Sequence, residues 1–349
     1  MKPVFLCCSK KAFILLLCLA FMFAAVSCSK GSQNNGQKTI ELRFAHFFPE
    51  VHPAETELVQ GWIKAITDAT DGRVKITNYP GETLIKANDI YSNVISGVAD
   101  IGLSCFSYTR GRFQVIEAFE LPGIIYKNSK VASKVAWEGI KELNPKEIQD
   151  TELMMVIATG SGDLFTKVPV RGLEDIKSLQ IRATGLSAKT VELLNGVPVA
   201  MAQSEAYEAL SKGIVKGNLA PIEVLKGWRH AEVTQYLTKT PFLYNTLFFI
   251  TMNKEKWNSL PEDIQQIILE VNEKVFDEIG IGLWDSQNEA ALKWAIEDQG
   301  MEIIELSEDE KDRWIKLIEP IHAEFSKKIN DDTVIEKVKE LAAKYNEIY

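Results

Sequence analysis

One helical pattern in the C-terminal half of the chain is too long to lie on a single compact lobe. Apolar residues recur with helical spacing over residues 262–299, and an unbroken helix over this range would be about 50 Å long. We therefore expect this helix to bridge two lobes, with Gly280 and Gly282 as bend points. Ser259 and Glu262 have the spacing of a capping box at its start.

Strand and helix patterns alternate before this helix. Period-2 or continuous apolar runs predict strands and helical spacing predicts helices, in the order strand 40–44, helix 58–66, strand 74–78, helix 84–97, strand 98–103 and strand 153–158. Strand, helix, strand at this spacing predicts the crossover connections of an α/β lobe. The run 153–158 is apolar throughout, which is typical of a strand buried on both faces of a parallel sheet.

The same alternation returns later in the chain and predicts a second lobe. It occupies residues 179–221, and a strand over 244–252, an edge strand over 303–306 and a largely helical segment over 308–349 follow. The predicted fold class is α/β with two lobes, each a mixed, mostly parallel sheet flanked by helices. We assign residues 39–158 and about 247–285 to lobe I, and residues 159–246 and about 286–349 to lobe II.

The N-terminus has the pattern of an export signal. Two lysines precede an apolar run over residues 12–26 that ends in Ala-Val-Ser-Cys28, a lipobox-like site, and the run is too short to span a membrane comfortably. We expect residues 1–27 to be removed as a signal peptide, Cys28 to be lipidated and residues 28–38 to form a flexible tether. The alternative is ordinary cleavage nearby. The predicted location is the periplasm or the cell surface, as a membrane-anchored lipoprotein.

Charge and cysteine content narrow the function classes further. Loss of the signal peptide removes three lysines and no acidic residue, so the formal net charge changes from −9 to −12. An acidic protein of this kind is a poor candidate for binding nucleic acid. Cys7, Cys8 and Cys18 lie in the removed segment and Cys28 would be lipidated, which leaves Cys105 alone. We therefore expect no internal disulfide.

The sequence contains no strong signal for catalysis, a metal or a cofactor. Gly160-Ser-Gly162 lacks the third glycine and the following helix start of a phosphate-binding loop, and no glycine-flanked serine elbow is present. The histidines are too scattered to suggest a metal site: His46, His52, His230 and His322. We expect no cofactor, no metal and no enzymatic activity.

Arg182 is the residue that most clearly suggests ligand binding. It closes the predicted strand 179–182 at the start of the second strand and helix unit. An arginine keeps its charge and offers a planar pair of donors, so a strand-end arginine that faces a cleft suits a carboxylate. The alternative is a surface salt bridge, which is the more common role of a lone arginine.

Aromatic and small polar residues also follow predicted strand ends, where ligands bind in open α/β sheets. They are Phe47, Phe48, Ser104, Cys105, Phe106 and Tyr108. The alternative for the aromatic residues is that they fill the core. Trp228 and the pair Trp284 and Trp294 are expected to be packing residues.

These segments together resemble the periplasmic solute-binding subunits of TRAP (tripartite ATP-independent periplasmic) transporters. The resemblance rests on residues 98–102, 119–123 and 173–221, and its most specific part is Val199-Ala-Met-Ala-Gln-Ser-Glu-Ala-Tyr-Glu-Ala-Leu210. Residues 260–266 are similar to the family's opening of its long hinge helix. The likeness covers the chain from Thr39 onward. It implies the two-lobed clamp of periplasmic binding proteins, which closes on an organic acid.

The resemblance also implies which residues form the site. Arg182 matches the arginine that binds the ligand carboxylate, and Asn245 falls where the family often has a ligand-contacting asparagine. Gln203 stands where many members carry an aromatic residue, and Leu219-Ala220 before Pro221 departs from the common Gln-Glu-Asn-Pro. The full set of predicted ligand-binding residues is Arg182, Asn245, Gln203, Ser104, Cys105, Phe106, Phe47, His46, Ser161, Gly162 and Pro221.

The implied partners follow from the family. The loaded subunit would dock on TRAP membrane permease subunits that use an ion gradient, and the lipid anchor on Cys28 would hold it at the membrane. We expect a monomer. One alternative is a solute-binding lipoprotein of another uptake or sensing system, such as an ATP-driven importer. An exported enzyme is the least favoured interpretation.

Overall fold

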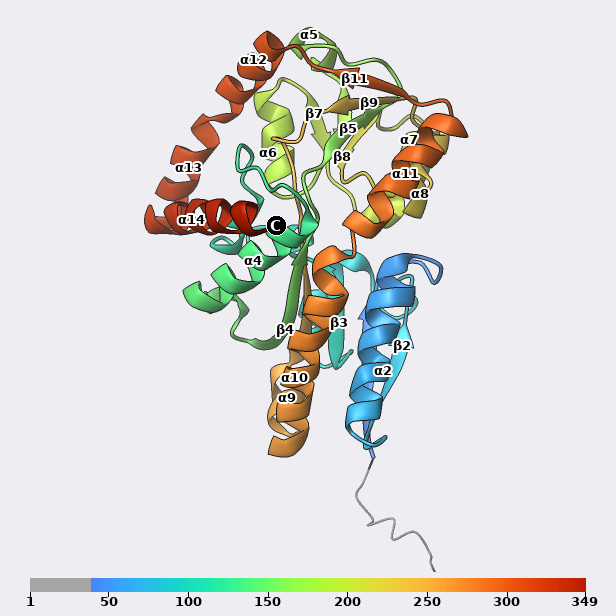
Figure 1. The fold of residues 1–349 in the computed structure, drawn as a ribbon, viewed down its shortest axis with the longest axis vertical. Coiled ribbons are helices and arrows are strands. Elements are labelled where there is room, and N and C mark those ends of the chain that lie inside the picture. Colours follow the sequence, from blue (N-terminus) through green and yellow to red (C-terminus); the bar gives the residue numbers. More distant parts are fainter. Residues whose placement is uncertain (1–38) are drawn as a thin grey trace, which may run out of the picture. The chain divides into compact units, whose positions relative to one another are not determined.

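Two separate β-sheets organise the described part of the chain (Figure 1). The structure, a computed structural model, describes residues 39–349, so the predicted signal peptide, the tether and Cys28 lie outside the described residues. The strand order is β2-β1-β3-β10-β4 in the first sheet and β11-β9-β5-β8-β6-β7 in the second. Helices flank both sheets. The predicted two-lobed α/β fold is confirmed.

The first sheet contains β1 (Ile40–His46), β2 (Val74–Tyr79), β3 (Ile101–Cys105), β4 (Thr151–Ala158) and β10 (Leu247–Asn253). β1 pairs in parallel with β2 and β3, whereas β10 runs antiparallel to β3 and β4. The helices on this side are a π-helical turn (Ala54–Val59), α2 (Gln60–Ala69), α3 (Ile90–Ile95), α4 (Ser129–Leu143), α9 (Lys254–Asn258) and α10 (Glu262–Glu278).

The prediction of a parallel strand over residues 153–158 was wrong. β4 lies at the edge of the first sheet and pairs only with β10, in antiparallel orientation. Its residues are buried because α4 and α10 pack against it. A continuous apolar run indicates a strand that is buried on both faces. It does not indicate whether the neighbouring strand is parallel or antiparallel.

The second sheet contains β5 (Asp163–Thr166), β6 (Gln180–Arg182), β7 (Val197–Val199), β8 (Gly217–Ala220), β9 (Tyr236–Lys239) and β11 (Glu302–Glu305). Three pairings are parallel, β6 with β7, β6 with β8 and β9 with β11, while β5 is antiparallel to β8 and β9. The predicted edge strand is confirmed as β11. The helices here are α5 (Leu173–Ile176), α6 (Leu186–Leu193), α7 (Gln203–Ser211), α8 (Val224–Gly227), α11 (Asp285–Glu297) and α12 (Glu308–Ile318).

The long helical pattern is interrupted where bend points were predicted. α10 ends at Glu278, a 3-10 turn follows over Gly280–Gly282, and α11 begins at Asp285. α10 packs on α2 and β4 of the first sheet, and α11 packs on α8 of the second. A Cβ atom at Gly280 would lie 3.1 Å from the side chain of Ile157, so the close approach favours glycine there. The chain therefore crosses from the first lobe to the second between α10 and α11.

The predicted capping box at the start of α10 was wrong. The residue before the helix is Pro261, which provides no side-chain cap. The hydroxyl of Ser259 instead donates to the carbonyl oxygen of Lys256 at 2.6 Å, at the end of α9. Ser259 therefore belongs to the end of the preceding helix, because the two helices are separated by only a short connection.

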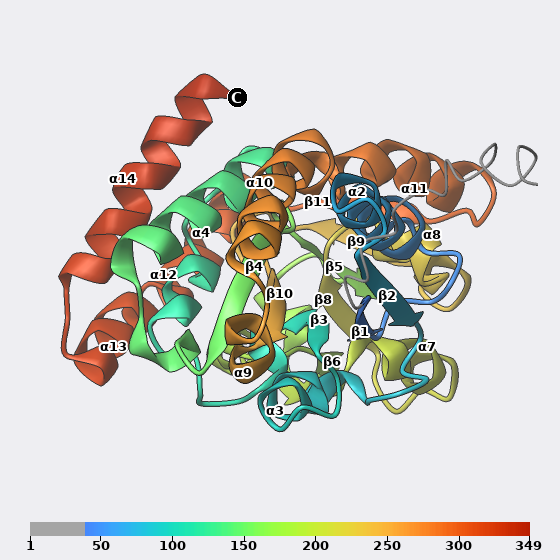
Figure 2. The ribbon, with the colours of Figure 1, turned by 90° about the horizontal axis from the view of Figure 1, so that it is seen from below.

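The last two helices, α13 (Pro320–Ile329) and α14 (Thr333–Ile348), lead the chain back toward the first sheet. α14 packs along α4, as Figures 1 and 2 both show. Its apolar side chains join the core of the first sheet: Val334, Val338 and Leu341. The limits of the two lobes stay a prediction.

Within residues 39–349, no helix is both long and apolar enough to cross a membrane. The same residues contain no group of three potential metal ligands.

Candidate functional site

A small cavity lies where the two sheets meet, at the carboxyl ends of several strands. Phe47 and Phe48 follow β1, Cys105 ends β3, Arg182 ends β6 and Pro221 follows β8. The cavity measures about 20 Å³. This is close to the space that a single water molecule needs, so the two lobes are closed against each other here.

Most of the side chains that line the cavity are polar or aromatic, and Pro221 and Val224 complete the lining. The polar ones are Arg182, Thr184, Gln203, Glu223, Thr246 and Cys105. The aromatic ones are Phe47, Phe48, Tyr108, Trp228, Tyr244 and Phe248. Of the predicted site residues, the cavity brings together Phe47, Cys105, Arg182, Gln203 and Pro221.

Arg182 is buried, with 2 % of its surface exposed. Its Nε donates to the carbonyl oxygen of Met201 at 3.1 Å, and its Nη2 donates to the hydroxyl of Tyr108 at 3.3 Å. No acidic side chain of residues 39–349 forms an ion pair with it. This is not the surface salt bridge that was the alternative. A buried cation with only neutral partners is costly, so the arrangement favours an anion in the cavity.

Tyr108 connects the two lobes at this point. It lies in the turn after β3, yet its hydroxyl accepts hydrogen bonds from Arg182 and, at 2.9 Å, from the backbone N–H of Gln203. Burial raises the pKa of Tyr108 well above its usual value. The hydroxyl therefore keeps its proton, and it can still donate that proton while it accepts two bonds.

A buried amide and imidazole network supports Gln203. The Nε2 of Gln203 lies 3.0 Å from Nε2 of His230, and Nδ1 of His230 lies 3.1 Å from Nδ2 of Asn218. Burial, with a smaller effect from the charge of Arg182, lowers the pKa of His230 to about 3. A neutral imidazole has one donor and one acceptor, and Oδ1 of Asn218 lacks a partner. With the Asn218 amide reversed, its Oδ1 accepts from Nδ1 of His230, and Nε2 of His230 accepts from Gln203.

Glu223 and His52 form a second contact between the lobes. Glu223 precedes α8, and His52 lies just before the π-helical turn Ala54–Val59. Oε2 of Glu223 lies 3.1 Å from Nε2 of His52. Both side chains are buried. The backbone N–H of Ala54 donates to Nδ1 of His52 at 3.0 Å. Because Nδ1 accepts, the proton of the imidazole lies on Nε2 and is donated to Glu223.

Flat aromatic contacts form one wall of the cavity. The ring of Phe47 lies nearly parallel to Trp228, with centroids 6.0 Å apart, and to Phe248, at 6.4 Å. Tyr108 meets Phe47 edge-on at 5.5 Å. Trp228 was predicted to be a packing residue, and it does pack here, but it also lines the cavity. Such parallel rings suit a flat apolar ligand.

Six predicted site residues lie outside the cavity lining: His46, Ser104, Phe106, Ser161, Gly162 and Asn245. Ser104 donates to the carbonyl oxygen of Ala87 at 2.9 Å, and Nε2 of His46 pairs with Glu55 at 2.8 Å. The ring of Phe106 packs against Phe113 and Phe249. These three side chains face partners within the first lobe. Their contact with a ligand stays a prediction.

The other three lie near the crossings between the lobes. Nδ2 of Asn245 donates to the carbonyl oxygen of Phe119 at 3.0 Å, and Ser161 donates to that of Tyr126 at 3.3 Å. A Cβ atom at Gly162 would lie 2.4 Å from the ring of Tyr244, so only glycine fits behind this wall of the cavity. Their roles in ligand binding also stay predictions.

Sequence reasoning missed six residues that line the cavity: Thr184, Glu223, Val224, Tyr244, Thr246 and Phe248. Glu223 lies two residues after Pro221, just beyond the end of β8. This place after a strand end is the only feature of the sequence that could have indicated a ligand-binding role for it. Cys105 lines the cavity, and its contact with a ligand stays a prediction. Burial raises the pKa of its thiol, so the group stays protonated and is a poor nucleophile.

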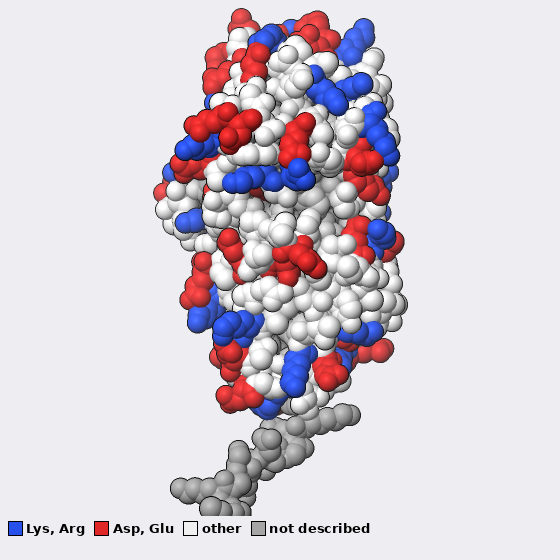
Figure 3. Space-filling view, turned by 90° about the vertical axis from the view of Figure 1, so that its right-hand side faces the viewer, with Lys and Arg blue, Asp and Glu red and all other residues white. Residues whose placement is uncertain are grey.

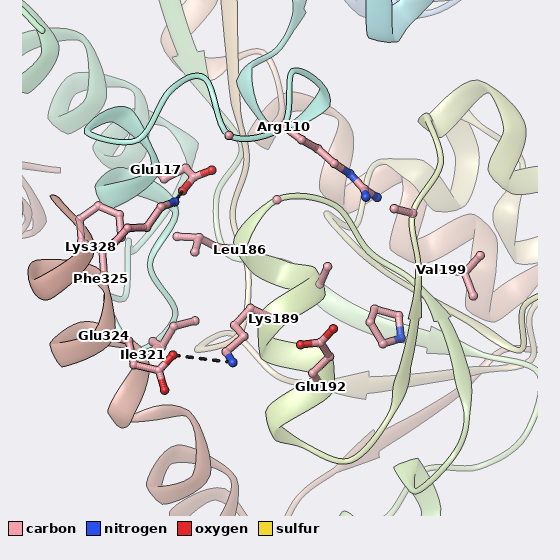
Figure 4. A pocket seen from close by; sticks show the side chains of 15 residues that line it. Arg110, Glu117, Leu186, Lys189, Glu192, Val199, Ile321, Glu324, Phe325 and Lys328 are labelled. Atoms are coloured by element: carbon pink, nitrogen blue, oxygen red, sulfur yellow. Dashed lines mark hydrogen bonds and ion pairs between the residues drawn. The ribbon is translucent and has the colours of Figure 1, made fainter. Parts of the chain in front are cut away.

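A larger hollow of about 860 Å³ opens between α6 and α13 (Figure 4). Four of its charged side chains form two ion pairs, Lys189 with Glu324 at 3.7 Å and Lys328 with Glu117 at 2.9 Å. These groups therefore need no ligand to balance their charge. On the face shown in Figure 3, acidic and basic side chains are interspersed with uncharged surface, with no extended basic field. This hollow is a weaker candidate than the cavity around Arg182.

The chain matches known proteins over most of its length. The model of the bacterial extracellular solute-binding protein family 7, DctP, matches residues 44–328. The C4-dicarboxylate-binding periplasmic protein DctP of Rhodobacter capsulatus is 26 % identical over 271 residues, which cover 76 % of this chain and 80 % of that protein.

Two solved structures are similar in both fold and sequence. A TRAP periplasmic solute-binding protein from Desulfovibrio salexigens is 32 % identical, with a TM-score of 0.75, and the match covers 88 % of this chain and 96 % of that one. A marine metagenome TRAP solute-binding protein specific for aromatic acid ligands, in complex with metahydroxyphenylacetate, is 27 % identical. Its TM-score is 0.82, with coverage of 88 % and 99 %. With two α/β lobes closed over a buried arginine, this chain belongs to family 7 of the bacterial extracellular solute-binding proteins, the family of TRAP periplasmic binding subunits.

Proposed function

We propose that this protein captures a small organic acid outside the cytoplasm and delivers it to TRAP membrane subunits, with Arg182 as the carboxylate anchor. The observation that carries the proposal is the burial of the Arg182 guanidinium with only neutral partners. A ligand carboxylate would supply the missing counter-charge and could accept two parallel hydrogen bonds from the planar group.

The residues that line the cavity support an aromatic monocarboxylate as the ligand. Arg182 is the only lysine or arginine that lines it among the described residues, so a second carboxylate would find no second cation. Glu223 would also repel a second carboxylate. The parallel rings around Phe47 suit a flat ligand. The similar metagenome protein, which is specific for aromatic acids, supports the same class.

Binding requires the lobes to separate and then to close around the ligand with a wider cavity, because a cavity of about 20 Å³ is far smaller than an aromatic acid. Several polar contacts would have to break when the cleft opens. Besides the bonds of Tyr108 and Glu223, they include Ser107 with Thr184 at 3.3 Å and Ser204 with Glu82 at 3.0 Å. A ligand that contacts both lobes would favour the closed state.

The same proposal covers the setting in which the protein works. We infer a monomer that is held at the membrane by a lipid on Cys28, with the tether 28–38 allowing it to reach the membrane subunits. The family consists of solute-binding transport proteins, and we propose no catalytic activity for this member.

Mass spectrometry of the native purified protein tests this function. We expect a small aromatic acid to copurify with the wild-type protein and to be lost from Arg182→Ala. A control variant, Arg110→Ala, removes an arginine at the larger hollow and should keep the ligand (Figure 4). A copurified ligand without a carboxylate would contradict the proposal.

A further inference from the structure

We propose that Glu223 is a second recognition group, which selects aromatic acids that carry a hydrogen-bond donor such as a ring hydroxyl. This inference rests on the proposed function, because it assumes that the carboxylate of the ligand binds Arg182. It adds a chemical requirement for the other end of the ligand, and it makes Glu223 a specificity-determining residue of the same cavity.

Glu223 and Arg182 are opposite charges held apart in one cavity. Both side chains line it and both are buried, yet they form no ion pair with each other. Each is held by its own neighbours: Arg182 by Met201 and Tyr108, and Glu223 by His52. A ligand that occupies the cavity therefore meets a cation and an acceptor at two separate places.

The carboxylate of Glu223 has unused capacity to accept hydrogen bonds. A carboxylate offers two oxygens and about four acceptor positions. Within residues 39–349, the only hydrogen bond that its side chain forms is the one from Nε2 of His52 to Oε2. The remaining acceptor positions of a buried carboxylate favour a further donor, and a ligand hydroxyl or ammonium group could supply it.

The contact with His52 fixes where this acceptor lies. Ala54 holds Nδ1 of His52, so the imidazole donates through Nε2 and orients Oε2 of Glu223. The ring of His52 also packs against Phe48, with centroids 4.8 Å apart, and against Trp228 at 5.6 Å. Glu223 is therefore positioned beside the same aromatic groups that would hold the ligand ring.

The alternative is that the pair of Glu223 and His52 only holds the lobes together. The two roles predict different results. A contact that only closes the cleft should favour every ligand equally, whereas an acceptor for a ligand donor should favour only ligands that carry one. A comparison of matched ligands therefore separates them.

The test uses two pairs of acids that differ by one hydroxyl: benzoate with 3-hydroxybenzoate, and phenylacetate with 3-hydroxyphenylacetate. Calorimetry gives the dissociation constant of each for the wild-type protein and for Glu223→Gln. We expect the wild-type protein to bind the hydroxylated member of at least one pair about tenfold more tightly or better, as for a hydrogen bond to a charged group. In Glu223→Gln this preference should fall to about threefold or less, because the amide is a weaker acceptor.

His52→Gln is the matched control. It keeps the carboxylate of Glu223 and supplies an amide N–H that can still donate to Oε2 in place of the imidazole. It should therefore weaken binding of both members of a pair by a similar factor and preserve the preference. Equal binding of both members by the wild-type protein would overturn the inference and leave the proposed function standing. A preference that survives in Glu223→Gln would also overturn it. If none of the four acids binds the wild-type protein, the proposed aromatic acid function fails and the inference fails with it.

Discussion

The hydroxyl of Tyr108 accepts a hydrogen bond from Nη2 of Arg182 at 3.3 Å, across the boundary between the two sheets. The same oxygen accepts from the backbone N–H of Gln203 at 2.9 Å. One side chain of the first lobe thus contacts both the proposed carboxylate anchor and the start of α7 in the second lobe. This places the anchor at the point where the lobes close.

Tyr108→Phe should therefore affect both stability and binding. The substitution leaves the buried N–H of Gln203 without its partner, which we expect to lower the free energy of unfolding by about 1 to 3 kcal/mol. Ligand affinity should fall as well, because Arg182 loses a neighbour that holds it. Urea denaturation and calorimetry measure the two effects.

A matched control for this variant is Tyr126→Phe. Tyr126 is also buried and donates to the carbonyl oxygen of Phe119 at 3.1 Å, but it does not line the cavity. It should lose stability while keeping ligand affinity. Equal ligand affinity in Tyr108→Phe and Tyr126→Phe would show that Tyr108 does not support the anchor.

Asn245→Ala tests a residue that the sequence placed in the site. We expect ligand binding to weaken by about 1 to 3 kcal/mol if its amide leaves a buried ligand oxygen unpaired. In the closed structure this amide donates to the carbonyl oxygen of Phe119, so stability should fall too. Calorimetry on the folded variant measures the change in ligand affinity. A dissociation constant equal to that of the wild-type protein would make Asn245 a structural residue.

Glu120 should make stability depend on pH. Burial raises its pKa from 4.5 to about 7, although Oε1 accepts hydrogen bonds from Thr246 and from the N–H of Leu247. The folded state then holds a proton that the unfolded state releases above pH 4.5. Stability from this group is therefore lost as pH rises from about 4.5 to 7, by at most about 3 kcal/mol.

Glu120→Gln should remove this loss, because the amide stays neutral and can still accept through Oε1. Urea denaturation at pH 5 and pH 8 should give a smaller difference for the variant than for the wild-type protein. Glu142→Gln serves as the control, since Glu142 pairs at the surface with Lys337. Identical pH dependence in wild type and Glu120→Gln would show that Glu120 is not the responsible group.

The sequence predicted those features that local patterns determine. The alternation of strands and helices, the edge strand β11 and the break near Gly280 all follow from periodicity and glycine positions. Arg182 could be selected because its residue type and its place at a strand end point to the same ligand chemistry.

Features that depend on tertiary contacts could not be predicted in this way. The antiparallel pairing of β4 is set by β10, which lies about ninety residues further along the chain. Glu223 meets His52 only because the lobes close, and the separation of 171 residues gives no sequence signal. Ser259 has the spacing of a helix start but serves the end of α9, since the same residue types favour both positions.

Membrane attachment is tested by Cys28→Ser. The lipid chains are the only proposed attachment to the membrane. The variant should therefore move to the soluble fraction, while the wild-type protein sediments with membranes. Labelled fatty acid should enter only the wild-type protein. A variant that still sediments, together with no labelling of the wild type, would contradict lipid anchoring.

Calorimetric titration of Arg182→Ala with the acid that copurifies with the wild-type protein tests the central claim most directly. Loss of one partner of a buried pair costs about 3 to 5 kcal/mol, so affinity should fall by roughly two to four powers of ten. Arg182→Lys should also bind more weakly, because an ammonium group keeps the charge but lacks the planar pair of donors. Wild-type affinity in Arg182→Ala would contradict the assignment of Arg182 as the carboxylate anchor.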